Sequence, residues 1–220
     1  TQKPLEEEQI QLFFSDIEPL AASKVLLRLE NETLSIGERV LAQELQLTVR
    51  GQEKIGIIGP NGIGKSTLLA KLHQLLSAKR EISLGYMPQD YHKKLQLELS
   101  PIAYLSQTGQ KEELQKIQSH LASLNFSYPE MQHHIRSLSG GQQGKLLLLD
   151  LVLCKPNFLL LDEPTRNFSP TSQPEIRKLF ATYPGGLVTV SHDRRFLKEV
   201  CRSIYRLTKN GLEIVDLQDL

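Results

Sequence analysis

The sequence has 220 residues, of which 40% are hydrophobic and 23% are charged, and this composition suits a globular protein with an ordinary buried core. It contains no run of about 18 apolar residues and no basic-then-apolar N-terminus, which argues against a membrane span and a secretory signal. The net charge is +1 with lysine and arginine spread along the chain, so no basic stripe indicates nucleic-acid binding by this segment. We therefore expect a cytoplasmic protein. Because the sequence starts at Thr1 and has methionine only at Met87 and Met131, we also expect a piece of a longer chain.

Residues 1–22 form a polar segment with three consecutive glutamates, followed by Leu12, Phe13, Phe14 and Ile17. These apolar residues lie at spacings that favour one face of a helix. One interpretation is a solvated helix that packs one apolar edge, and the other is the end of a connector between two domains. We expect residues 23–220 to form the main domain.

From residue 25 the sequence predicts strands. The short β-favouring runs are VLLRLE, LQLTV and KIGIIG, and the last of them leads into a glycine-rich loop and a helical stretch at residues 65–76. Another strand is expected to end near Gln89, after which about residues 92–137 have a mainly helical pattern.

The second half of the chain continues this alternation. The run LSGGQQGKLLLLDLVLC predicts a loop that opens an apolar helix, and PTSQPEIRKLFATY predicts a second helix. Between and after them, NFLLLD and GLVTVS are continuous apolar runs typical of central parallel strands. Strands alternating with helices predict an α/β core with a mainly parallel sheet, interrupted by a helical subdomain.

The glycine-rich loop at residues 59–67 fits the phosphate-binding pattern of Gly, four residues, then Gly-Lys-Ser/Thr. Glycines let consecutive backbone N–H groups turn inward around phosphate oxygens, and the following helix presents its positive N-terminus. Lys65 is expected to reach the β- and γ-phosphates of a bound nucleotide, and Ser66 to ligate Mg²⁺. The predicted nucleotide-binding residues are Asn61, Gly62, Ile63, Gly64, Lys65, Ser66 and Thr67.

Two carboxylates follow the apolar run at residues 158–161. Asp162 is a candidate to hold Mg²⁺, because this ion is usually bound by one or two protein oxygens together with phosphates. Glu163 comes next and is placed to polarise the water that attacks the γ-phosphate, so we assign it as the general base.

Leu138-Ser139-Gly140-Gly141-Gln142 resembles the signature of the ATP-binding cassette (ABC) superfamily, which stands at the start of a helix shortly before the strand with the carboxylates. The resemblance implies a P-loop NTPase core, an antiparallel β subdomain and a helical signature subdomain. It also implies that Gln89 joins the core to the helical subdomain and senses Mg²⁺ and the attacking water. His192 would be the switch histidine that contacts the γ-phosphate.

In this superfamily two cassettes close head to tail, and the resemblance therefore implies a second cassette as partner, in the same full-length chain or in a homodimer. The signature of one cassette completes the nucleotide site of the other, so a single cassette should hydrolyse ATP weakly. The residues expected to act in trans are Ser139, Gly140, Gly141 and Gln142.

The segment SHDRRFLKEV at residues 191–200 is similar to a segment of ABC-F proteins, which carry two cassettes and no membrane domain. Known ABC-F members act on the ribosome, some as translation factors and others by protecting it from antibiotics. Two alternatives stay open. The chain could be the ATPase motor of an ABC membrane transporter, with residues 92–137 docking a membrane domain, or a slow nucleotide-dependent switch in another assembly.

Two departures from the family pattern stand out. Typical ABC-F cassettes continue after the carboxylates with Pro-Thr-Asn-His-Leu-Asp, whereas this chain has Pro-Thr-Arg-Asn-Phe-Ser at residues 164–169. Ser169 thus replaces an aspartate expected to face the partner site, and the variant resembles one in antibiotic-resistance ABC-F proteins of Gram-positive bacteria. The second departure is Leu34-Ser35-Ile36-Gly37, where many cassettes place an aromatic ring for adenine, so base stacking must be weaker or come from elsewhere.

Overall fold

The computed structural model describes residues 10–220, and its centre is a six-stranded sheet with the order β4-β5-β6-β3-β7-β8. Neighbouring strands pair in parallel except β7 and β8, which are antiparallel, so the predicted mainly parallel sheet is confirmed. The strands are β3 (Lys54–Ile58), β4 (Leu84–Met87), β5 (Phe158–Asp162), β6 (Gly186–Val190), β7 (Ser203–Thr208) and β8 (Gly211–Val215).

A separate antiparallel hairpin forms from β1 (Val25–Ile36) and β2 (Arg39–Arg50). Ile36 pairs with Arg39, which leaves a tight turn in which Gly37 has a φ of 56°. This left-handed conformation suits glycine because it has no Cβ.

The sheet separates two hydrophobic cores, and successive residues of β5 point into opposite ones. Phe158 and Leu160 pack with the hairpin and with α1 (Lys65–Ser77). Leu159 and Leu161 pack instead in the core built by α5 (Gly140–Cys154), α6 (Gln173–Ala181) and α7 (Arg194–Val200). Burial on both faces explains why β5 and β6 are apolar except for Asp162 and Thr189, which are also buried.

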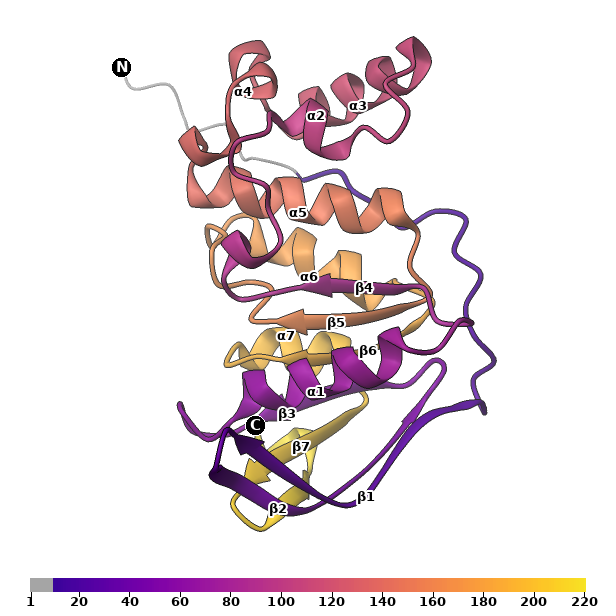
Figure 1. Ribbon diagram of the computed structural model, residues 1–220, viewed down its shortest axis with the longest axis vertical. Coiled ribbons are helices and arrows are strands. Elements are labelled where there is room, and N and C mark those ends of the chain that lie inside the picture. Colours follow the sequence, from indigo (N-terminus) through magenta and orange to yellow (C-terminus); the bar gives the residue numbers. More distant parts are fainter. Residues whose placement is uncertain (1–9) are drawn as a thin grey trace.

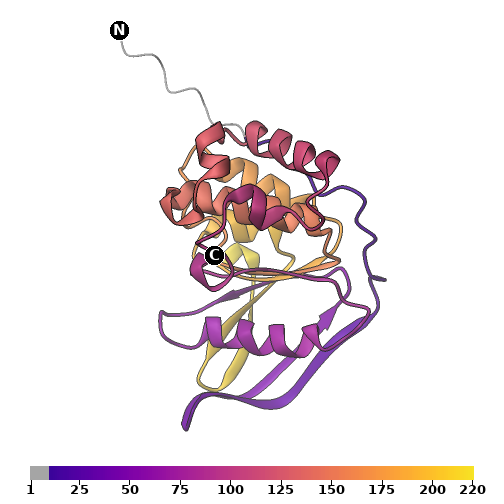
Figure 2. The same cartoon turned by 45° about the horizontal axis from the view of Figure 1, so that its top comes forward.

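The chain between β4 and α5 is mainly helical. It contains the 3₁₀ turns η1 (Tyr91–Lys93) and η2 (Ile135–Ser137), and the helices α2 (Pro101–Leu105), α3 (Lys111–Ser123) and α4 (Tyr128–Gln132). A third 3₁₀ turn, η3 (Leu217–Asp219), follows β8. Figure 1 shows α2, α3 and α4 above α5 at one end of the molecule, with the hairpin at the other. The tilted view in Figure 2 agrees with this arrangement.

The helix considered for residues 1–22 is wrong for the described part, because residues 10–22 contain no helix. The burial there has a period of two: Ile10 and Leu12 are buried, Phe13 is exposed, and Phe14 packs on Phe180 and Tyr183 at centroid distances of 6.2 and 4.7 Å. We call residues 10–22 the strap. Its aromatic contacts with the α6 side of the sheet determine its conformation, and these distant partners leave no signal in the local sequence. The glutamates at residues 6–8 lie outside the described residues.

Within residues 10–220, no helix is both long and apolar enough to cross a membrane.

The loop between α2 and α3 is held by the carboxylate of Glu113. Its oxygens accept hydrogen bonds from the backbone N–H groups of Gln107, Thr108 and Gly109 at 2.9–3.0 Å and from the hydroxyls of Ser106 and Thr108 at 2.8 Å. These donors, the backbone ones first, lower the pKa of Glu113 from 4.5 to about 2.

Glu113→Gln should lower the melting temperature, because an amide cannot accept as many hydrogen bonds as the carboxylate. The unfolded state binds more protons than the folded state between pH 2 and 4.5, so the Glu113 contribution is present above pH 4.5 and is lost as the pH falls toward 2. Thermal melts across this range should therefore converge for the two proteins at the acid end. Glu112→Gln, an exposed neighbour with the same change of charge, should leave the melting curve nearly unchanged.

Candidate active site

The phosphate loop connects β3 to α1 and depends on two left-handed glycines. Gly62 has a φ of 78° and Gly64, the residue that caps α1, a φ of 115°. A Cβ on Gly64 would also lie 2.9 Å from the Leu41 side chain. Only glycine permits this conformation at this distance, and the turn aims backbone N–H groups at the space in front of α1.

Lys65 is buried inside this loop. Its Nζ donates hydrogen bonds to the carbonyl oxygens of Gly59 and Pro60, at 2.7 and 2.8 Å. Burial lowers the pKa of Lys65, while the nearby carboxylates of Glu163 and Asp162 act in the opposite direction. The ammonium group is thus held within the loop by two backbone carbonyl oxygens.

Asp162 stands at the end of β5, opposite the first turn of α1. The Ser66 hydroxyl donates to Asp162 Oδ2 at 2.8 Å, whereas Oδ1 is buried and has no hydrogen-bond partner among residues 10–220. Burial raises the pKa of Asp162, and the bond from Ser66 opposes this effect. A hydroxyl oxygen beside a carboxylate with one unused oxygen is the donor set that Mg²⁺ prefers, so these residues fit the ion.

Glu163 is held in a left-handed conformation, with a φ of 50°. Its backbone N–H donates to the carbonyl of Val190 at the end of β6, at 2.8 Å. The Glu163 carboxylate accepts from the backbone N–H of His192 at 3.2 Å and also contacts Nδ1 of the His192 ring. The ends of two neighbouring parallel strands thereby place a carboxylate and an imidazole side by side.

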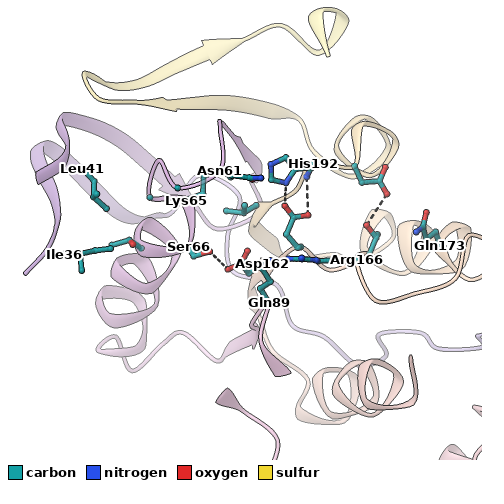
Figure 3. Close-up of a pocket in the computed structure, with 17 residues that line it drawn as sticks. Ile36, Leu41, Asn61, Lys65, Ser66, Gln89, Asp162, Arg166, Gln173 and His192 are labelled. Carbon is teal, nitrogen blue, oxygen red and sulfur yellow. Dashed lines mark hydrogen bonds and ion pairs between the residues drawn. The ribbon is translucent and has the colours of Figure 1, made fainter. Parts of the chain in front are cut away.

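These groups face one cavity of about 740 Å³ at the carboxyl ends of the strands. Figure 3 shows Asn61, Lys65, Ser66, Gln89, Asp162 and His192 around it. The predicted residues in its lining are Asn61, Gly62, Gly64, Lys65, Ser66, Thr67, Gln89, Asp162, Glu163 and His192. Ile63 is not in the lining and packs partly buried against the hairpin-side core.

The signature residues lie elsewhere. Ser139 caps α5 by accepting a hydrogen bond from the Gln142 backbone N–H at 3.2 Å. Gly140 is exposed, and a Cβ added to it would meet no atom within 4 Å. None of Ser139, Gly140, Gly141 and Gln142 lines the cavity of this chain.

A family model described as ABC transporter matches residues 42–166, more than half of the chain. The chain belongs to the ABC transporter family. It is an ATP-binding ABC cassette, and such cassettes are in general ATPases.

Relatives of the cassette include proteins of the expected subfamily. It is 30% identical over 210 residues to the probable ATP-binding protein YheS of Escherichia coli K12, covering 92% of this chain and 33% of YheS. It is 31% identical over 196 residues to the ribosome protection protein VmlR of Bacillus subtilis, covering 86% of this chain and 36% of VmlR. These relatives support membership of the ABC-F subfamily. The chain spans about a third of the length of the relatives it matches.

Solved structures support the fold. The cassette superposes on a dimeric post-hydrolysis state of the ATP-binding cassette MJ0796 bound to ADP and phosphate, with a TM-score of 0.71 and 20% identity over 86% of this chain and 98% of MJ0796. A bacterial Atm1-family ABC exporter with ATP bound gives a TM-score of 0.73 at 17% identity, over 93% of this chain and 41% of that one.

Sequence reasoning missed several residues that line the cassette's cavity. Ile36 and Leu41 flank the hairpin turn and form the apolar end of the cavity, with the Leu41 side chain packed against Gly64 of the phosphate loop. They occupy the region where the sequence lacked an aromatic ring, but their approach to the phosphate loop depends on how the hairpin packs on α1. The other missed lining residues are Thr165, Arg166, Gln173, Val190 and Asp193.

The unusual loop at residues 164–169 is anchored by Phe168, which is buried against the signature helix. A Cβ on Gly144 of α5 would lie 2.8 Å from the Phe168 ring, so the ring needs this glycine. Gln173 Nε2 donates to the Phe168 carbonyl at 3.2 Å. Ser169 bonds to the hydroxyls of Thr171 and Ser172, both at 3.0 Å, so its contacts within this chain are local.

Ile36→Tyr should tighten ATP binding by roughly two- to tenfold, because an aromatic ring at the apolar end of the cavity can stack on the base. Ile36 is 59% exposed, so the larger ring need not disturb the core. Calorimetric titration with ATP would measure the gain. Val40→Tyr is the matched control, since Val40 is also exposed but is not in the cavity lining. An equal gain in that variant would contradict the placement of the base beside Ile36.

Proposed function

We propose that this cassette binds and hydrolyses ATP as part of an ABC-F protein that acts on the ribosome. The observation that carries the ATPase proposal is the single cavity in which Lys65, the Ser66–Asp162 pair and the Glu163–His192 pair face one another. The similarity to VmlR, named as a ribosome protection protein, supports the ribosomal part.

ATP would lie with its phosphates in the loop and its base toward Ile36 and Leu41. Backbone N–H groups at the start of α1 would bind phosphate oxygens, and Lys65 would contact the β- and γ-phosphates. Since Ile36 and Leu41 are aliphatic, the base is held by van der Waals contact without ring stacking.

Ser66 and Asp162 would hold Mg²⁺, with Gln89 beside them in the cavity. When bound, the ion would neutralise charge on the β- and γ-phosphate oxygens. The unused Oδ1 of Asp162 supports this role, since a buried oxygen without a partner is costly.

Glu163 would act as general base in the hydrolysis. It would take a proton from water as the water oxygen bonds to the γ-phosphorus, and the bond from that phosphorus to the bridging oxygen breaks. The electron pair of the broken bond stays on that oxygen, giving ADP and inorganic phosphate. His192, in contact with Glu163, would contact the γ-phosphate and help to orient the base.

A second cassette would complete the site. The signature residues Ser139 to Gln142 do not line the cavity of their own chain, and Ser139 and Gly140 are exposed while Gly141 and Gln142 are partly buried. They would instead meet the nucleotide of a partner. On this proposal the isolated cassette hydrolyses ATP weakly. The dimeric arrangement named for MJ0796 is consistent with such pairing.

Glu163→Gln should keep ATP binding and lower hydrolysis by about 10²–10⁴-fold, because the phosphate loop is intact while the proton acceptor is lost. In the longest form of the protein that carries this cassette, the variant should accumulate on ribosomes when ATP is present. Phosphate release and ribosome co-sedimentation measure the two effects. Unchanged hydrolysis would contradict the assigned base, and slow hydrolysis without ribosome binding would favour a different partner, such as a membrane domain.

Lys65→Ala should weaken ATP binding by roughly 10–100-fold, since charge-assisted hydrogen bonds contribute about 1.5–3 kcal/mol. Calorimetry in the Glu163→Gln background avoids turnover during the measurement. Lys71→Ala is the control: Lys71 is on the same helix, pairs with Glu32 at 2.8 Å and does not line the cavity. Equal affinity of the Lys65 variant and the unchanged protein would show that another group binds the terminal phosphates.

A further inference from the structure

Arg166 lines the ATP cavity, and the family pattern gives it no role there. Its side chain has no hydrogen bond or ion pair with any other residue in the part of the chain that the structure describes. It also lines an adjoining cavity of about 350 Å³, together with Ser66, Gln89 and Asp162. Figure 3 shows the guanidinium end of Arg166 directed toward Asp162 and Gln89.

The backbone around Arg166 is fixed on both sides. Its N–H donates to the carbonyl of Glu163 at 3.2 Å, and the Phe168 N–H donates to the carbonyl of Thr165 at 3.2 Å. Phe168 anchors the far side of this turn by its burial against α5. Arg166 therefore projects from a firmly held turn that starts at the proposed general base.

Among the basic side chains that the structure describes in the cavity lining, Arg166 differs from Lys65 and His192 in its hydrogen-bond partners. Lys65 is bonded to two loop carbonyls and His192 contacts Glu163, whereas Arg166 keeps all five of its donors available. Arginine stays charged in proteins, and its planar group matches two phosphate oxygens at once. Asp162 and Glu163 line the same cavity as Arg166 and form no ion pair with it.

We propose that Arg166 is a catalytic residue that binds γ-phosphate oxygens in the transition state, on the side opposite Lys65. This inference rests on the proposed ATPase function. As the water oxygen bonds to phosphorus and the bridging oxygen leaves with its electron pair, negative charge spreads over the equatorial oxygens. Arg166 would stabilise that charge as an arginine supplied by the same chain, and no proton passes through it.

The test compares Arg166→Ala, Arg166→Asn and Arg166→Lys in the longest form of the protein that carries this cassette. Steady-state kinetics give kcat and KM, calorimetry gives the ATP dissociation constant in the Glu163→Gln background, and binding of ADP with aluminium fluoride reports on the transition state. Arg80→Ala is the control, because Arg80 is exposed in the turn that follows α1 and lines neither cavity.

Arg166→Ala and Arg166→Asn should lower kcat by about 10²-fold or more, since an arginine of this kind contributes 10³–10⁵ in related phosphoryl-transfer enzymes. In these two variants the ATP dissociation constant should change less than threefold, whereas ADP–aluminium fluoride binding should weaken at least tenfold. The values for Arg166→Lys should lie between those of Arg166→Ala and those of the unchanged protein. Unchanged kcat, or an ATP affinity that falls as much as kcat/KM, would overturn the proposal.

The two proposals can fail separately. If the unchanged protein and the Glu163→Gln variant hydrolyse ATP at the same rate, the proposed function fails. In that case ADP–aluminium fluoride binding still decides on Arg166: selective weakening in Arg166→Ala, relative to ADP alone, supports its contact with the phosphoryl group, and equal binding excludes it.

Discussion

The hydrogen bond from the Glu163 N–H to the Val190 carbonyl is the contact on which the site depends. It extends the parallel pairing of β5 and β6 by one step beyond Asp162, which is the last paired residue of β5. Because the strands are parallel and in register, their carboxyl ends reach the same edge of the sheet. The chain then turns through the left-handed Glu163, so that Asp162 faces Ser66 while Glu163 faces His192.

The two cores give this edge its rigidity. One core ties β5 and β6 to α1 and the hairpin, and so sets the phosphate loop and the apolar end of the cavity. The other ties the same strands to α5, and so sets the signature. Phe168 joins the two regions, because it is buried against α5 while its loop carries Arg166 into the cavity. The nucleotide site and the signature of one chain are thus parts of one packed unit.

Much of this arrangement can be predicted from short stretches of sequence. The phosphate loop, the strand that ends in Asp162 and Glu163, and the helical character of residues 92–137 depend on local patterns, and the structure has helices and strands where these patterns predict them. The failures involve distant contacts. The apolar spacing in residues 1–22 favours a helix, but Ile10 and Leu12 are buried in the core and Phe14 packs on Phe180 and Tyr183. Ile36 and Arg166 reach the cavity only through the packing of the hairpin and of Phe168.

The strap also has a mechanical consequence. It begins in the core of the helical layer with Ile10 and Leu12, and it ends beside the hairpin, where the Gln52 side chain donates to the Leu20 carbonyl at 2.8 Å. Because both ends of the strap are attached, a displacement of the helical layer relative to the hairpin must either carry the strap along or break one of these contacts.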